Sequence, residues 1–160
     1  MHARASELVA LLGLAPHPEG GHYRRVHTSA STHPWSGRER SALSAIHYLL
    51  AAGETSRWHR VDADESWHHV EGDALELLAF DPATRRLDRH RLGRPDARGT
   101  SPLVVVPAGT WQAARPRGDY ALVGCSVGPA FEFAGFTLLS DVPDVAASLA
   151  ARHPDLASLL

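Results

Sequence analysis

Hydrophobic residues recur at helical spacing only near the two ends of the chain. In residues 4–13, Leu8, Leu11 and Leu12 follow Ser6, which predicts a short amphipathic helix with Ser6 as its N-cap. Residues 142–160 are rich in Ala and Leu, which predicts one or two further helices. The intervening residues show a different period.

Between the ends, apolar segments alternate with Gly, Pro and Asp turns at roughly the 8–12-residue spacing that is typical of β-sandwiches and barrels. Strands are predicted at 41–50, 65–72, 73–80, 88–93, 103–107, 119–129 and 131–139. Residues 29–40 are polar and interrupted by Pro and Gly, which predicts a loop. We therefore predict one all-β domain over residues 1–160, with the β-body at about 20–139 and helical ends at 4–13 and 142–160.

Composition and charge exclude several classes of protein. The formal net charge is −2 and basic residues are mixed with acidic ones, so no nucleic-acid interface is predicted. No run of 18 apolar residues predicts a membrane span. Cys125 is the single cysteine, so no internal disulfide can form, and the first residues lack a signal-peptide pattern. We expect a cytoplasmic protein.

Residues 53–72 concentrate side chains that can carry chemistry, with three of the 11 His and two of the four Trp. Side chains two positions apart on a strand share a face, so Glu65, Trp67 and His69 point to one side. If that side faces the interior of a barrel, His59 and Glu65 meet there and His69 joins them. Such a group is suited to acid/base catalysis or to a metal, and a purely structural hydrogen-bond network is the alternative.

The spacing within this segment is informative. Gly53 is followed after five residues by His59, Glu65 comes six positions later, and Gly72 seven after that. This pattern resembles the first motif of the cupin superfamily, except that Val61 stands where the motif has its second His. Residues 107–112, PAGTWQ, resemble the second motif with Gln112 at its His position.

The chain is most similar to the small single-domain cupins of type five, a group of unknown function. The matching segments are GGHYRR (20–25), AIHYLL (45–50), SRWHRVDADESWHHVEGD (56–73), PAGTWQAA (107–114) and LVGCSVGPAFEFAGF (122–136). The resemblance implies a double-stranded β-helix, the cupin jelly roll, which often forms homodimers. Cupins include metal-dependent oxygenases, sugar isomerases, metal-free sugar epimerases and binding proteins without catalytic activity, so the fold does not select the function.

By analogy with the metal-free epimerases, the leading hypothesis is a small-molecule enzyme that moves a proton next to a carbonyl group. His59 is the predicted base, Glu65 its carboxylate partner and Gln112 a polar orienting group. Tyr48 is the predicted acid, and Tyr23 is the alternative for that role. A metal-dependent oxygenase or isomerase is the first alternative, with a weakly bound divalent metal on His59, Glu65 and Gln112. A non-catalytic ligand sensor is the second.

The ligand is expected to be a small, carbohydrate-like molecule. Its candidate contacts are His69, Trp67, Tyr23 and Arg24. Aromatic residues in strands more often pack in a core, so burial is the structural alternative for Trp67.

Overall fold

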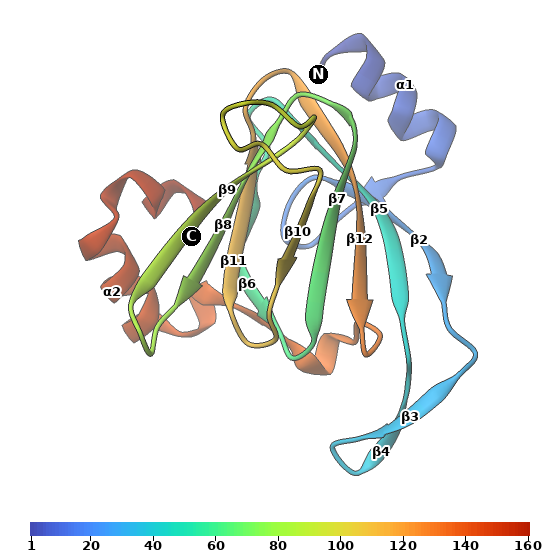
Figure 1. The fold of residues 1–160 in the computed structure, drawn as a ribbon, viewed down its shortest axis with the longest axis vertical. Helices are drawn as coiled ribbons and strands as arrows, with labels where there is room; N and C mark the ends of the chain where they lie inside the picture. The colour runs from blue at the N-terminus through green and yellow to red at the C-terminus, as the bar shows by residue number, and fades with distance from the viewer.

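Two antiparallel sheets face each other and form the body of the protein, which a computed structural model describes over all residues 1–160 (Figure 1). The six-stranded sheet has the order β1 (Ala15–Pro16), β2 (His22–Thr28), β5 (Ser44–Ala51), β12 (Tyr120–Gly128), β7 (Asp64–Gly72) and β10 (Leu103–Val106). The five-stranded sheet has the order β13 (Phe136–Leu138), β6 (Ser56–Val61), β11 (Trp111–Pro116), β8 (Leu75–Asp81) and β9 (Arg86–Leu92). This architecture is the jelly roll predicted from the sequence.

The largest hydrophobic core lies between the two sheets. Tyr48, Trp67, Leu77 and Val123 belong to a cluster of 13 buried residues that are contributed by strands of both sheets. Alternating side chains of each strand enter this core, which is why the period of two in the sequence locates the strands. One end of the barrel interior is thereby filled, and the other end is left for a cavity.

The N-terminal helix packs on the outer face of the six-stranded sheet. This helix, α1 (Ala3–Leu12), buries Ala5 and Leu8 against Leu49 of β5 and Leu122 of β12. The prediction that Ser6 is the N-cap was wrong. His2 is the N-cap, and its Nδ1 accepts the backbone N–H of Arg4 at 3.2 Å.

The C-terminal segment covers the outer face of the five-stranded sheet. It contains the short helices η2 (Leu139–Asp141), α2 (Pro143–Arg152) and η3 (Pro154–Leu159), whereas η1 (Phe133–Gly135) precedes β13. Leu149 of α2 and Leu156 of η3 are fully buried against Trp58, Leu78 and Trp111. None of the helices is long and apolar enough to cross a membrane. The C-terminal helices are thus part of the folded core rather than an appendage.

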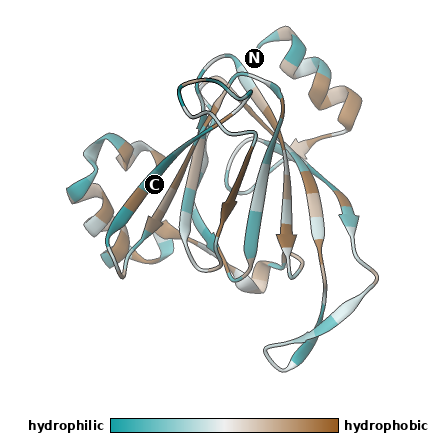
Figure 2. Cartoon of the chain, in the orientation of Figure 1, coloured by the Kyte–Doolittle hydropathy of each residue, from teal (hydrophilic) through white to brown (hydrophobic).

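Residues 29–40 are not a loop, as was predicted, because they contain most of a hairpin. Strands β3 (Thr32–Trp35) and β4 (Arg38–Ser41) are joined by Ser36 and Gly37, whose φ angles of 48° and 81° suit a two-residue hairpin turn. The hairpin projects away from the barrel and carries mostly polar residues, so its sequence lacks the alternation of a half-buried strand (Figures 1 and 2). Arg40 anchors its base through bonds to Asp62 and to the carbonyl oxygen of Ala130.

Truncating Leu149 tests whether the C-terminal helix stabilises the barrel. Leu149 is 0% exposed, so Leu149→Ala leaves a cavity and we expect a loss of about 3 kcal/mol in the free energy of unfolding, measured by urea titration. Ser148→Ala changes an exposed residue of the same helix and serves as the control. Equal stabilities of the two variants would show that α2 does not pack as described.

Candidate functional site

A cavity of about 650 Å³ opens at the end of the barrel that the core does not fill. Two histidines and two glutamates form a cluster on its wall: His17 and Glu19 from the segment between β1 and β2, His59 from β6 and Glu65 from β7. Apolar side chains of both sheets form much of the remaining wall. The cavity therefore combines a polar cluster with an apolar surface, which is the usual character of a small-molecule site.

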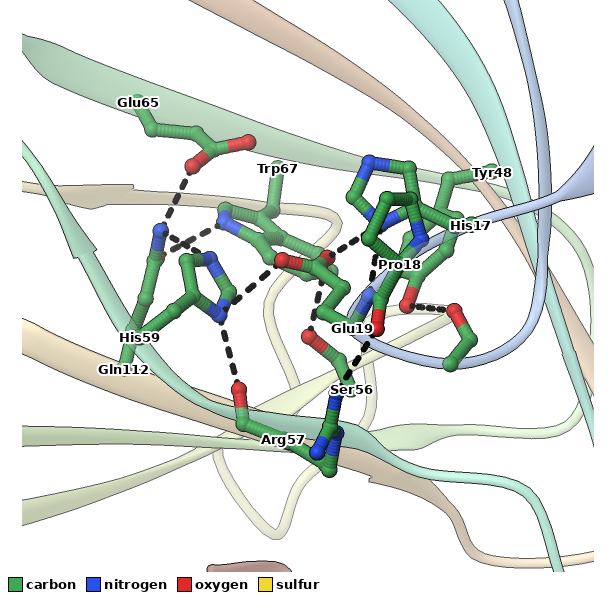
Figure 3. A network of polar contacts seen from close by, with 11 residues as sticks. His17, Pro18, Glu19, Tyr48, Ser56, Arg57, His59, Glu65, Trp67 and Gln112 are labelled. Atoms are coloured by element: carbon green, nitrogen blue, oxygen red, sulfur yellow. Dashed lines mark hydrogen bonds and ion pairs between the residues drawn. The ribbon is translucent and has the colours of Figure 1, made fainter. Parts of the chain in front are cut away.

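Gln112 joins the two predicted catalytic groups from behind the cavity wall (Figure 3). Its amide nitrogen lies 2.5 Å from Oε2 of Glu65 and 3.1 Å from Nε2 of His59. Trp67 fixes the orientation of this amide, because its Nε1–H donates to Oε1 of Gln112 at 3.1 Å and an indole has no acceptor. The two amide hydrogens must therefore point toward His59 and Glu65.

The hydrogen bonds also define the tautomer of His59. Its Nδ1 lies 2.8 Å from the carbonyl oxygen of Arg57 and 3.1 Å from Oε2 of Glu19, and both oxygens are acceptors. Nδ1 therefore carries the proton, and Nε2 accepts from Gln112. Burial lowers the pKa of His59, although the charge of Glu65 opposes this shift. The imidazole is thus held in its neutral form with a defined orientation.

Glu19 is the functional residue that the sequence interpretation missed. Its carboxylate is 6% exposed and accepts a hydrogen bond from Ser56 Oγ at 3.1 Å, in addition to its contact with His59. The following Gly20 has φ 116°, and a Cβ there would clash with the carbonyl oxygen of Thr55. The turn is recognisable in the sequence, but only the close approach of this loop to β6 brings Glu19 to the imidazole.

Burial dominates the titration of both carboxylates. Burial, assisted by the charge of the neighbouring Glu19 and opposed by His59 and Gln112, raises the pKa of Glu65 to about 7. Burial likewise raises the pKa of Glu19, and His17 and Ser56 oppose that shift. A carboxyl group whose pKa lies near neutrality is suited to both giving and taking a proton.

The residues predicted as tentative metal ligands do not fit a metal ion in this arrangement. The amide hydrogens of Gln112, rather than its oxygen, face the space between His59 and Glu65, and they would repel a cation. Val61 offers no donor atom on the cavity wall. No group of three or more His, Cys, Asp or Glu side chains is arranged to hold a metal. The donor set is that of a hydrogen-bond network.

Three further predicted residues lie away from the open cavity. Tyr48 is 1% exposed and its hydroxyl donates to the carbonyl oxygen of Gly20 at 2.7 Å, so it supports the Glu19 loop rather than facing a ligand. Trp67 is equally buried, and it orients Gln112 instead of stacking on a ligand. His69 lies beyond Trp67 along β7, and its Nε2 contacts the carbonyl oxygen of Asp73 at 3.3 Å.

The structure brings the other predicted residues to the cavity or directly behind it. Tyr23 and Arg24 of β2 are among the lining residues, with His59 and Glu65. Gln112 is fully buried behind them and touches both His59 and Glu65. Tyr23 packs edge-on against His17, with ring centroids 4.4 Å apart. The catalytic and binding roles of all these residues stay predictions.

Comparisons with known proteins identify relatives of this fold. A family model described as cupin superfamily, DUF985, matches residues 6–139. A crystal structure of a Shewanella oneidensis protein is 33% identical with a TM-score of 0.85, and the alignment covers 98% of this chain and 96% of that one. A hypothetical protein from Leishmania major is 29% identical with a TM-score of 0.81, over 97% and 95% of the two chains.

A more distant neighbour supports the fold alone. Oxalate decarboxylase from Bacillus subtilis is 16% identical with a TM-score of 0.62, and the alignment covers 87% of this chain and 34% of that one. A comparison with curated proteins finds no match. The predicted cupin jelly roll with short terminal helices is confirmed.

The raised pKa of Glu65 makes the stability of the protein depend on pH. The pKa of this carboxyl is 4.5 without the influence of the fold and about 7 within it, so the folded state binds the proton more tightly. The resulting stabilisation is complete below about pH 4.5 and is lost as the pH rises through about 7. Glu65→Gln has no carboxyl at this position. We therefore expect its unfolding free energy, relative to that of the wild type, to rise by about 3 kcal/mol as the pH is raised from about 4.5 to 8.

Urea titrations at several pH values measure this difference. Glu39→Gln removes an exposed carboxylate from β4 and controls for the loss of a charge as such. A constant difference between Glu65→Gln and the wild type over the whole range would contradict the raised pKa.

Proposed function

Because the chain belongs to the cupin superfamily, in the family DUF985, we propose that it is a small-molecule enzyme that moves a proton next to a carbonyl group, as in sugar epimerisation or isomerisation. One observation carries this proposal. The carboxyl of Glu65 and the neutral imidazole of His59 line the same cavity, and Gln112 bridges them from behind. Proton transfer at carbon needs such a base, held in place and shielded from bulk water.

Glu65 is the group that takes the proton from carbon. One of its oxygens accepts from Gln112, and the other remains available to the substrate. His59 is less suited to this role than the sequence suggested, since Gln112 already donates to its Nε2 and Glu19 contacts its Nδ1. His59 and Glu19 instead tune the proton affinity of Glu65, because His59 lowers the pKa of this carboxyl and Glu19 raises it.

The developing negative charge on the carbonyl oxygen needs a hydrogen-bond donor. His17 Nδ1 accepts the backbone N–H of Glu19 at 3.2 Å, so Nε2 of His17 carries a proton and is free to donate. Burial lowers the pKa of His17, which keeps this donor neutral. Tyr23 replaces Tyr48 as the acid, because Tyr23 lines the cavity and Tyr48 does not.

The charge around the cavity favours an anionic, carbohydrate-like substrate. Arg24 and Arg25 line the cavity and make no ion pair with a carboxylate, and their only side-chain hydrogen bonds go to backbone oxygens. Glu132, which also lines it, is neutralised by Arg38. Guanidinium groups bind carboxylate and phosphate well. A sugar acid or a sugar phosphate therefore suits this site better than a neutral sugar.

Solvent-deuterium exchange tests the proposed reaction. Neutral sugars, sugar acids and sugar phosphates are first screened by thermal shift, and each ligand found is then incubated with the protein in D₂O and examined by NMR. We expect deuterium at the carbon next to the carbonyl, and a rate about 10²–10⁴-fold lower in Glu65→Gln. Glu39→Gln, which lies on the projecting hairpin, is expected to keep the wild-type rate.

Two outcomes would contradict the proposal. Binding without exchange or conversion would indicate a sensor rather than an enzyme. Stoichiometric metal in the purified wild type that is lost in His59→Ala would indicate a metal-dependent cupin.

The proposed enzyme is a cytoplasmic homodimer. Its single cysteine, Cys125, is free and buried, which suits a reducing compartment.

Strand β2 pairs with β1 only at His22 and Tyr23, so the rest of its outer edge has no neighbour. An open strand edge favours pairing with a second copy of the chain.

Two exposed valines on the opposite edges of this sheet provide a matched test of the dimer. Val26 on β2 is 48% exposed and Val105 on β10 is 53% exposed. A charge at the paired edge should weaken association, so we expect Val26→Arg to raise the dimer dissociation constant at least about tenfold and Val105→Arg to leave it unchanged. Light scattering over a range of concentrations measures both, and a monomeric wild type would contradict the proposal.

A further inference from the structure

A second hollow lies at the edge of the five-stranded sheet, and it is lined only by polar residues. Its volume is about 270 Å³, and its walls are formed by Glu76, Arg89, His90, Arg91 and Arg117. Glu76 on β8 lies directly opposite Arg91 on β9 and Arg115 on β11. Residues that oppose each other in antiparallel strands share a face of the sheet, so these side chains gather on one side.

Glu76 holds the arginines of this cluster in place. Its carboxylate is 5% exposed and accepts Nε of Arg115 at 2.7 Å and Nη2 of Arg117 at 3.0 Å. Nη1 of Arg89 lies 3.7 Å from the same carboxylate. Arginine side chains that are fixed in this way lose little further conformational entropy when they bind a ligand.

The cluster carries more positive than negative charge. Its four guanidinium groups, on Arg89, Arg91, Arg115 and Arg117, face the carboxylates of Glu76 and of Asp155, which binds Arg89 at 2.7 Å. The nearby Asp96 accepts the backbone N–H groups of Arg98 and Thr100 and adds a third carboxylate, which leaves a surplus of one positive charge. Repulsion among the guanidinium groups is therefore only partly neutralised.

Arg91 is the least occupied member of the cluster. Its side chain makes no hydrogen bond or ion pair in the structure, although it lines the hollow. Arg117 binds Glu76 through one Nη and is 54% exposed, so its other N–H groups face solvent. Arg91 and Arg117 thus present free N–H donors to the hollow, in a cluster with surplus positive charge.

The sequence concentrates its cations at this edge. The chain has no lysine, so all 16 of its Lys and Arg residues are arginine, and six of them fall within residues 85–98, on β9 and the loops at its two ends. An excess of arginine also protects an edge strand from pairing with other chains. Protection of an edge strand does not require the arginine side chains to converge on a hollow. It also does not require a buried carboxylate that holds them in place.

We propose that this arginine hollow binds a small oxyanion of the phosphate class, independently of the barrel cavity. The planar guanidinium group offers paired N–H donors that match the oxygens of phosphate. Arg91 and Arg117 supply the direct contacts, and Glu76 positions Arg115 and Arg117. The small volume favours inorganic phosphate, pyrophosphate or the phosphoryl group of a metabolite over a polymer.

Arg91→Ala is the decisive variant, because it removes no hydrogen bond or ion pair of the folded protein. Phosphate and pyrophosphate are titrated by calorimetry, with NaCl adjusted to constant ionic strength. We expect saturable binding in the wild type and a dissociation constant at least about tenfold higher in Arg91→Ala and in Arg117→Ala. Arg85→Ala removes the same charge from the turn at the other end of β9 and is expected to bind like the wild type.

Three results would overturn the assignment. The first is no saturable binding of either anion to the wild type. The second is equal binding by Arg91→Ala and the wild type, which would place the anion elsewhere, the barrel cavity included. The third is a protein that ignores both small anions but binds a short oligonucleotide with steep dependence on salt, which would indicate a polymer ligand.

Discussion

The hydrogen bond from Trp67 to Gln112 determines the chemistry of the barrel cavity. An amide can be turned to present either its oxygen or its nitrogen, and the indole N–H of Trp67 can donate only to the oxygen. With the oxygen occupied, the nitrogen must serve His59 and Glu65. That single orientation makes Nε2 of His59 an acceptor, supplies a donor to Glu65, and removes the amide oxygen as a possible ligand for a cation. Trp67 therefore acts on the site without touching the cavity.

Burial supplies the second constraint on the site. Glu19, Glu65 and His59 are all under 10% exposed, and burial disfavours the charged form of each. A charge or hydrogen bond of a neighbouring group opposes this effect at each residue, and the net result is a raised pKa for both carboxyl groups and a lowered pKa for the imidazole.

Sequence spacing predicted the parts of the site that lie on regular strands. His59, Glu65 and Gln112 are recognisable because each sits at a fixed distance from a turn, and strand alternation sends all three inward. His69 is four positions from Glu65 on the same strand and therefore shares its face of the sheet. It nevertheless lies outside the cluster, because strand alternation predicts the face of a side chain and not its depth along the barrel. The core around Trp67 fills the barrel between Glu65 and His69, and no local sequence pattern predicts this filling.

Loops and polar hairpins were the least predictable parts. Glu19 reaches His59 through a loop whose path depends on the contact between Gly20 and Thr55, two residues far apart in sequence. Tyr48 was expected in the cavity, but its hydroxyl donates to the carbonyl oxygen of Gly20 on the same loop. The hairpin of β3 and β4 was not predicted, because Arg40 is its only buried residue and its strands therefore show no hydrophobic alternation. In each case a tertiary contact, absent from any local window, decides the outcome.

The substitutions at positions 61 and 112 relative to the cupin motifs are better understood as a rebuilt site than as a lost one. Loss of a metal ligand by drift would leave buried polar atoms without partners, which is costly. Here Gln112 is fully buried with its oxygen and its nitrogen both bonded, and none of Glu19, His59, Glu65 or Gln112 has a buried atom without a partner. A network with no function would gain stability by replacing Glu65 with a neutral residue, since ionising a buried carboxyl opposes folding. The two carboxyl groups and two imidazoles on the wall of an open cavity are consistent with the proton transfer proposed for this site.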